Sequence, residues 1–197
     1  YDYSGFPPES YQLMYPASGH ATLACELQRA LSNEGLIAHL DATRGFDHGM
    51  FVPLTLMYPN ADIPVVQLSL LSSLDGAEHI AMGRALRVLR DRRVLVLGSG
   101  ATYHNLQAYF AGTMDRDAHH QFENWLAQQC CDETLSDDTR QTALAHWQRA
   151  PGALHCHPRA EHLMPLQVCA GMAGGPAQRV FFDEVMGELS SAFLWQY

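Results

Sequence analysis

The chain has 197 residues, a net charge of −9 at pH 7, a hydrophobic fraction of 47% and twelve basic residues, all of them arginine. This length suits one domain with a substantial core, the negative charge argues against a nucleic-acid surface, and the absence of lysine excludes Schiff-base chemistry and a phosphate loop. The apolar runs are too short to span a bilayer, and no signal peptide is visible. The five cysteines show no C-x-x-C spacing and are typical of reduced thiols. We therefore expect a cytoplasmic protein.

Hydrophobic periodicity predicts helices and strands in alternation along the first half of the chain. The spacing of Leu23, Leu27 and Leu31 favours an amphipathic helix that Ser18 could cap and that Gly35 would end. The expected helices span residues 17–34, 51–58 and 75–90, and the expected strands span 36–40, 63–70 and 94–97.

The second half predicts helices within 115–149, a helix over 158–170 with Pro158 in its first turn, and closing strands at 181–186 and 191–195. The alternation indicates an α/β fold, a single domain over 1–197 with a central mostly parallel sheet flanked by helices. Ligands bind beyond the carboxyl ends of such strands. Because His48 and His104 each follow a predicted strand, we expect them to approach one crevice.

The loop from Arg44 to Leu54 carries Asp47 and His48 between Gly45 and Gly49. Glycine tolerates backbone conformations that other residues avoid, so these glycines predict a tight loop that places His48 in a cleft. A histidine held in this way can bind a metal, move a proton or donate to an anion.

This loop is followed in order by the segments 62–69, Gly98-Ser99-Gly100-Ala101-Thr102-Tyr103-His104-Asn105-Leu106 and His157-Pro158-Arg159-Ala160-Glu161-His162-Leu163-Met164-Pro165-Leu166. Together they resemble the class III extradiol ring-cleavage dioxygenases, in particular the DOPA-dioxygenase-like branch, from Tyr1-Asp2-Tyr3 nearly to the end. The resemblance implies an oxidoreductase that opens a catechol ring with dioxygen. It implies iron(II) as the metal, with zinc(II) as the alternative, and a small aromatic diol and dioxygen as partners, without nucleic acid or membrane.

The resemblance also implies roles for individual residues. His162 matches the late metal ligand, His104 a histidine that is either a ligand or the acid–base group, and His48 the substrate-side histidine. Asp47 would orient a histidine or cap the loop. Glu161 competes with His162 as ligand, because successive helix residues point about 100° apart and only one of the two can face the metal; the pattern E-H-L-x-P-L favours His162.

The family's first two metal-ligand histidines lie in an H-G-[GS]-P segment and an S-A-H-W segment, and neither motif occurs here. We therefore expect a catalytic domain that lacks the family's N-terminal segment and cannot assemble all ligands alone. The alternatives are a non-catalytic relative that acts as a binding protein, and a zinc-bound form without ring cleavage. A bare sheet edge would favour a homo-oligomer.

The remaining histidines carry no metal-site pattern. His155-Cys156-His157 places its side chains on differing faces, so we expect a surface turn, with His157 structural or in support of the metal ligands. His119, His120 and His146 lie on predicted helices and are expected to be solvated.

Overall fold

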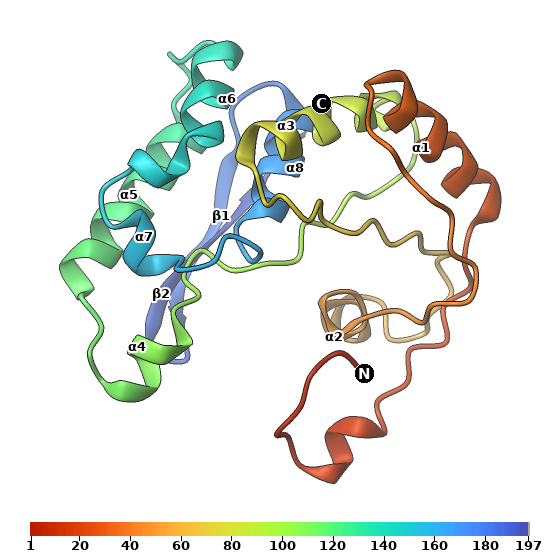
Figure 1. Ribbon diagram of the computed structural model, residues 1–197, viewed down its shortest axis with the longest axis horizontal. Coiled ribbons are helices and arrows are strands. Elements are labelled where there is room, and N and C mark those ends of the chain that lie inside the picture. Colours follow the sequence, from red (N-terminus) through yellow and green to blue (C-terminus); the bar gives the residue numbers. More distant parts are fainter. Residues whose placement is uncertain (197) are drawn as a thin grey trace. The chain divides into compact units, whose positions relative to one another are not determined.

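The computed structural model describes residues 1–196, and the chain folds into two compact units, Tyr1–Ser69 and Leu70–Tyr197. No helix in the described part of the chain has both the length and the apolar character needed to cross a membrane. In chain order (Figure 1) the elements are η1 (Pro8–Tyr11), α1 (Ala21–Asn33), α2 (His48–Met57), α3 (Gly76–Ala85), η2 (Leu86–Leu89), α4 (Leu106–Ala111), α5 (Arg116–Cys131), α6 (Asp137–Ala145), η3 (Trp147–Arg149), α7 (Ala153–Cys156), α8 (Met164–Ala173), β1 (Gln178–Val185) and β2 (Glu188–Leu194).

The Tyr1–Ser69 unit contains α1 and α2. The predicted apolar stripe of α1 is confirmed, because Leu23, Leu27 and Leu31 are all buried. The helix begins later than predicted, since Nδ1 of His20, rather than Ser18, accepts the hydrogen bond from the backbone N–H of Leu23. An imidazole nitrogen thus satisfies one of the donors that every helix start leaves unpaired.

In the Leu70–Tyr197 unit, α3 and α8 pack directly on each other. Their close approach depends on glycine at the crossing point. A Cβ on Gly83 would collide with the backbone carbonyl of Val168, and one on Gly171 would collide with that of Ile80. Only glycine lets two helix backbones come this close, so these two residues set the packing of the helix pair.

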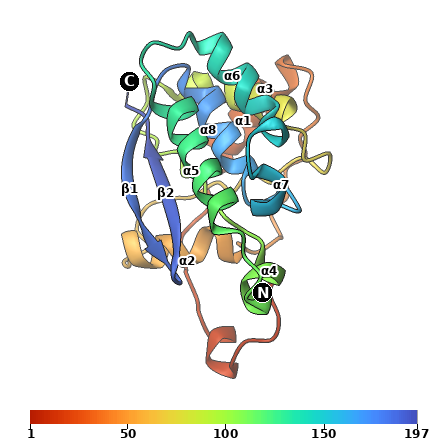
Figure 2. The same cartoon turned by 90° about the vertical axis from the view of Figure 1, so that its left-hand side faces the viewer.

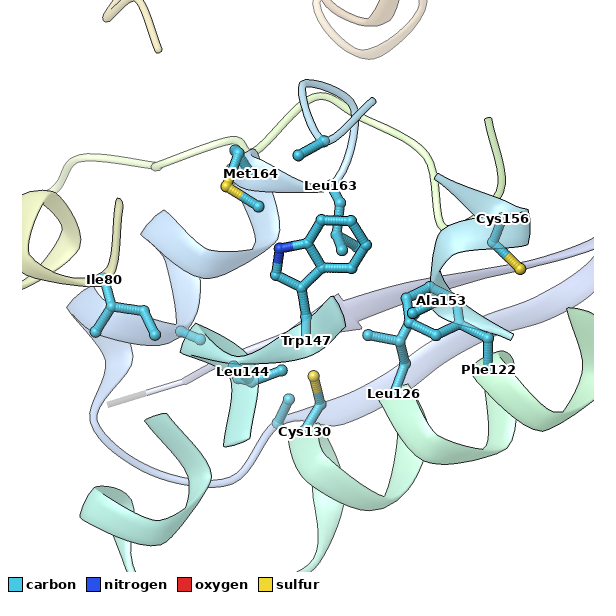
Figure 3. Close-up of a cluster of buried hydrophobic side chains, with 13 residues drawn as sticks. Ile80, Phe122, Leu126, Cys130, Leu144, Trp147, Ala153, Cys156, Leu163 and Met164 are labelled. Carbon is cyan, nitrogen blue, oxygen red and sulfur yellow. The ribbon is translucent and has the colours of Figure 1, made fainter. Parts of the chain in front are cut away.

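The core of this unit is centred on Trp147, which is 2% exposed. Its indole lies among side chains from α5, α6 and the residues just before α8, including Leu126, Leu144 and Leu163 (Figure 3). Removal of such a side chain costs about 3–5 kcal/mol through lost burial and the resulting cavity. This core fixes the position of the segment that carries residues 156–164.

The predicted closing strands are confirmed and form an antiparallel hairpin of β1 with β2. The turn passes through Met186 and Gly187, both with positive φ. The hairpin packs against α5 (Figure 2), and a register shift interrupts its pairing between Arg179 and Phe181.

The expected central parallel sheet is not present in the described chain. Within residues 1–196, strand pairing is confined to the β1–β2 hairpin and one isolated parallel bridge between Gly19 and Val65. The segments 36–40, 63–70 and 94–97 are not strands, although their composition predicts them. A strand requires a hydrogen-bonded neighbour, and residues 1–196 supply these segments with none beyond that bridge. The α/β class is supported by the helices and the hairpin, but the predicted sheet topology is wrong for these residues.

Candidate metal centre

The potential metal-binding atoms of His104, Glu161 and His162 all lie within 4.8 Å of one another, and each of these residues is partly buried. The three residues come from two segments of the Leu70–Tyr197 unit, an extended loop that ends at α4 and a turn that precedes α8. Two imidazoles and one carboxylate form the donor set that non-haem iron(II) sites use. The absence of the H-G-[GS]-P and S-A-H-W motifs predicted an incomplete set of ligands, whereas this cluster by itself offers three donors.

The loop and the turn are held together by backbone contacts. The Ala101 N–H donates to the His162 carbonyl at 2.9 Å, and the His104 N–H donates to the Cys156 carbonyl at 3.0 Å. A Cβ on Gly100 would collide with that His162 carbonyl. The Gly-Ser-Gly motif therefore allows the loop to run against the turn, which brings His104 to His162.

Glu161 and His162 both reach the cluster, contrary to the expectation that only one of them can face the metal. That expectation assumed a helix over 158–170, but α8 begins only at Met164, and residues 161–163 form a turn. Nδ1 of His162 lies 3.7 Å from Oε1 of Glu161. The other carboxylate oxygen of Glu161 accepts a hydrogen bond from Nε of Arg159 at 3.1 Å.

The rings of His104 and His162 stack with their centroids 3.3 Å apart and their planes 13° from parallel. Partial burial lowers the pKa of His104 below its ordinary value, against the opposing charge of Glu161. His104 is therefore neutral at pH 7, the form that can bind a metal or accept a proton. The donor chemistry fits iron(II) or zinc(II), but the lone pairs of parallel rings do not converge, so one ring must rotate before both bind one ion.

His155-Cys156-His157 is not the expected surface turn. Cys156 ends α7, and both Cys156 and His157 are 0% exposed. The ring of His157 packs edge-on against Phe122 and Trp147, and its Nε2 lies 2.9 Å from the carbonyl oxygen of Thr102. Burial lowers the pKa of His157 to about 4, so the ring is neutral and Nε2 carries the proton donated to Thr102.

His119 also differs from its prediction, because it is 0% exposed rather than solvated. It lies between two carboxylates, 3.8 Å from Glu123 and 3.6 Å from Glu188, and its ring lies 4.6 Å from that of Tyr103. Burial raises the pKa of Tyr103 to about 12. Helical periodicity alone cannot show that the hairpin, through Glu188, covers this face of α5.

Asp47 and His48 belong to the Tyr1–Ser69 unit. His48 is the first residue of α2, and its ring nitrogen Nδ1 lies 2.7 Å from Oδ2 of Asp2. Asp47 occupies the N-cap position without a side-chain cap, and its carboxylate instead bonds with Gln67. Sequence patterns did not predict Asp2 as the partner of His48, because no spacing rule links two residues so far apart in the chain.

The glycines of this loop do not act as predicted. His48 is solvent-exposed, and Gly49 lies inside α2. The glycines with positive φ in the described chain include neither Gly45 nor Gly49; they are Gly5, Gly35, Gly112, Gly152, Gly174 and Gly187. The loop is therefore shaped by the Asp2 and Gln67 contacts rather than by left-handed glycines. Of the predicted site residues, the structure brings together His104, Glu161 and His162, and a meeting of these with His48 remains a prediction.

The comparison with known families agrees with this site and fold. Residues 1–194 match the family described as the catalytic LigB subunit of aromatic ring-opening dioxygenase. The chain belongs to this family, as the sequence resemblance predicted.

Individual relatives agree with the family assignment. The chain is 42% identical to "Dioxygenase tasH" of Hapsidospora irregularis, over 99% of this chain and 63% of that protein. It is 39% identical to "4,5-DOPA dioxygenase extradiol" of Beta vulgaris, over 88% of this chain and 64% of that protein. It thus spans slightly less than two thirds of the length of these relatives.

A solved structure shares the fold. The crystal structure of the uncharacterized protein JW3007 from Escherichia coli K12 superposes with a TM-score of 0.76 at 33% identity. The superposition covers 92% of this chain and 74% of that one. The arrangement of helices and hairpin is therefore shared with an experimentally determined protein.

Proposed function

We propose that this protein is a non-haem, metal-dependent extradiol dioxygenase that opens a catechol-type aromatic ring with dioxygen, acting as one catalytic domain in the cytoplasm. The observation that carries the proposal is the convergence of His104, Glu161 and His162 within 4.8 Å. Membership of a ring-opening dioxygenase family and the names of the relatives support it. Its partners would be a small aromatic diol and dioxygen.

We assign Glu161 and His162 as metal ligands, with His104 as either the third ligand or the acid–base group. Iron(II) is the proposed metal, because it supplies the redox chemistry for dioxygen that zinc(II) lacks. A zinc-loaded protein would hold the same donors without ring cleavage. The partial burial of all three residues would limit the water that competes for the site.

Ring opening requires a base that removes a proton from the diol and an acid that returns one later. His104 is neutral at pH 7, since burial lowers its pKa, so its free nitrogen can accept the hydroxyl proton. We propose that His48 acts on the substrate side. Asp2, at 2.7 Å from Nδ1 of His48, would keep that ring in one orientation and leave Nε2 for the substrate.

The test is metal content and oxygen uptake of the purified chain after anaerobic loading with iron(II), with catechol and DOPA as probes. His162→Ala should lose both metal and uptake. His104→Ala should lose uptake, and retention of metal in this variant would make His104 the acid–base group, whereas loss of metal would make it a ligand. His39→Ala is the control, because His39 is exposed.

Three outcomes would contradict the proposal. Full uptake in both His104→Ala and His162→Ala would show that the cluster is not the site. Zinc binding, combined with no oxygen uptake after loading with iron(II), would identify the inactive zinc form. Absence of any metal and any uptake in the unaltered protein would favour a non-catalytic binding protein.

A further inference from the structure

Thr102 lies two residues before His104 and is 4% exposed. Its side-chain hydroxyl and its backbone carbonyl both accept hydrogen bonds. Its hydroxyl Oγ1 accepts a hydrogen bond from the backbone N–H of Ser191 in β2 at 3.1 Å, and its carbonyl accepts one from Nε2 of His157 at 2.9 Å. Thr102 thus joins the loop that carries His104 to the hairpin on one side and to the segment before His162 on the other.

The hairpin end of this connection is itself anchored. The hydroxyl of Ser191 donates to Oε2 of Glu123 on α5 at 2.5 Å, and the side chain of Glu123 is 1% exposed. A buried carboxylate without a hydrogen-bond donor is costly, so this contact favours one position of β2 on α5. The N–H of Ser191 that meets Thr102 is consequently held in place.

The other end of the connection is equally rigid. His157 is fully buried against Phe122 and Trp147, so its ring has little freedom to rotate. Beside it, the Asn105 side-chain amide donates to the His155 carbonyl at 2.7 Å. The loop around His104 is therefore tied on both sides of the histidine.

We propose that Thr102 is a positioning residue for the metal centre, with its hydroxyl held by Ser191 and its carbonyl by His157, so that His104 is presented to Glu161 and His162. The inference rests on the proposed function for the identity of the bound group. Thr102 is not one of the three residues of the cluster, and it acts through the backbone that it shares with His104.

The substitutions that test the proposal differ by single atoms or single groups. Thr102→Val keeps the shape of the side chain and removes the acceptor for the Ser191 N–H, whereas Thr102→Ser keeps the acceptor. His157→Leu removes the donor to the Thr102 carbonyl, whereas His157→Gln supplies an N–H in a similar position. Gln141→Met is the control for general loss of stability, because Gln141 is buried and bonds with Arg84 and Asp137 instead.

The first readout is zinc(II) affinity of the full chain, measured by competition with a chromophoric chelator. Thr102→Val and His157→Leu should weaken binding about tenfold or more, the range seen for residues that orient ligands, while Thr102→Ser, His157→Gln and Gln141→Met stay near the unaltered protein. In a His104→Ala background, Thr102→Val should have no further effect. Where zinc affinity depends on His104, equal affinity of Thr102→Val and Thr102→Ser, or an undiminished effect without His104, would overturn the proposal; where it does not, the second readout decides.

The second readout needs no metal. Because the rings of His104 and His162 are stacked, they should shift each other's ring protons in the NMR spectrum of the metal-free protein. Thr102→Val should remove these shifts and Thr102→Ser should retain them. If zinc fails to bind the unaltered protein, the proposed function fails, and this spectrum still decides whether Thr102 positions His104; unchanged shifts in Thr102→Val would refute it.

Discussion

His104 and His162 stack face to face, with ring centroids 3.3 Å apart, although they come from separate segments of the chain. Two neutral imidazoles can stack in this way, whereas two charged ones would repel each other. The relationship makes the pair sensitive to anything that moves the loop at Gly100 or the turn before α8. It also means that at least one ring must rotate if both histidines bind the same ion.

Substitution of Glu161 should show whether its carboxylate is a metal ligand in addition to His162. Glu161→Gln keeps the size of the side chain and removes its charge, so we expect zinc affinity to fall about 10–100-fold. Arg159→Gln is the matched control, because it removes the Arg159–Glu161 contact and keeps the carboxylate. Affinity of Glu161→Gln equal to that of the unaltered chain would leave His162 alone as the ligand of that turn.

If His104 is the third ligand, metal binding should also unstack the two histidines. Because the lone pairs of parallel rings do not converge, zinc(II) must change the mutual ring-proton shifts of His104 and His162 in the NMR spectrum. The exposed ring of His39 should keep its shifts and serves as the internal control. Unchanged shifts at saturating zinc would mean that His104 is not a ligand, which leaves it the acid–base role.

Stability should fall on acidification because of His157. Burial lowers the pKa of His157 from 6.5 to about 4, so in this window the unfolded chain binds a proton that the folded chain does not. The free energy of unfolding should therefore rise with pH between about 4 and 6.5 and decrease as the pH is lowered, by on the order of 3 kcal/mol across the window.

The variants that test this prediction are His157→Gln and His39→Gln, compared by urea unfolding across the same pH window. His157→Gln should flatten the slope, because its amide does not titrate there. His39→Gln should keep the slope, because His39 is exposed. An equally steep slope in His157→Gln would assign the pH dependence to other groups.

Gly100→Ala should damage both the fold and the site. The added Cβ would collide with the His162 carbonyl, so the loop and the turn must separate, at a cost of about 1–3 kcal/mol in the free energy of unfolding. Zinc affinity should fall in the same variant. Gly175→Ala is the control, because open space surrounds the position of its Cβ, and it should change stability by less than about 0.5 kcal/mol.

The Asp2–His48 pair predicts a shift in the pKa of a carboxyl group. Although partial burial opposes it, hydrogen bonds from the backbone and ring of His48 hold the pKa of Asp2 below its ordinary value. His48→Ala removes the ring partner, so the pKa of Asp2 should rise in an NMR titration. His39→Ala should leave it unchanged, and an unchanged value in His48→Ala would mean that the pair is not formed in solution.

Periodicity was a good guide where a local pattern determines the structure. The stripe of Leu23, Leu27 and Leu31 predicted α1, and the apolar positions of 75–90 predicted α3 with η2, because one buried face is sufficient to place a helix. The two closing strands were predicted as well, from their composition, but their antiparallel pairing with each other was not. The ordered motifs also predicted the family, since several residues in one order are far more specific than any single one.

The sequence could not predict which strands would find partners or which polar side chains would be buried. Val94–Leu97 has strand composition, yet pairing depends on a neighbouring strand that residues 1–196 do not supply. His157 and His119 looked like surface residues, because nothing in their local sequence shows that Trp147 or the hairpin covers them.

The sequence by itself determined the family, most of the helices and the two closing strands, and it named His104, Glu161 and His162 as candidate ligands while allowing only one of the last two to face a metal. Only the tertiary structure showed that Glu161 and His162 share a turn, that Gly100 lets His104 reach them, and that Thr102 connects the loop to Ser191 and His157. These relationships depend on packing between segments distant in the chain, and local patterns carry no record of that packing.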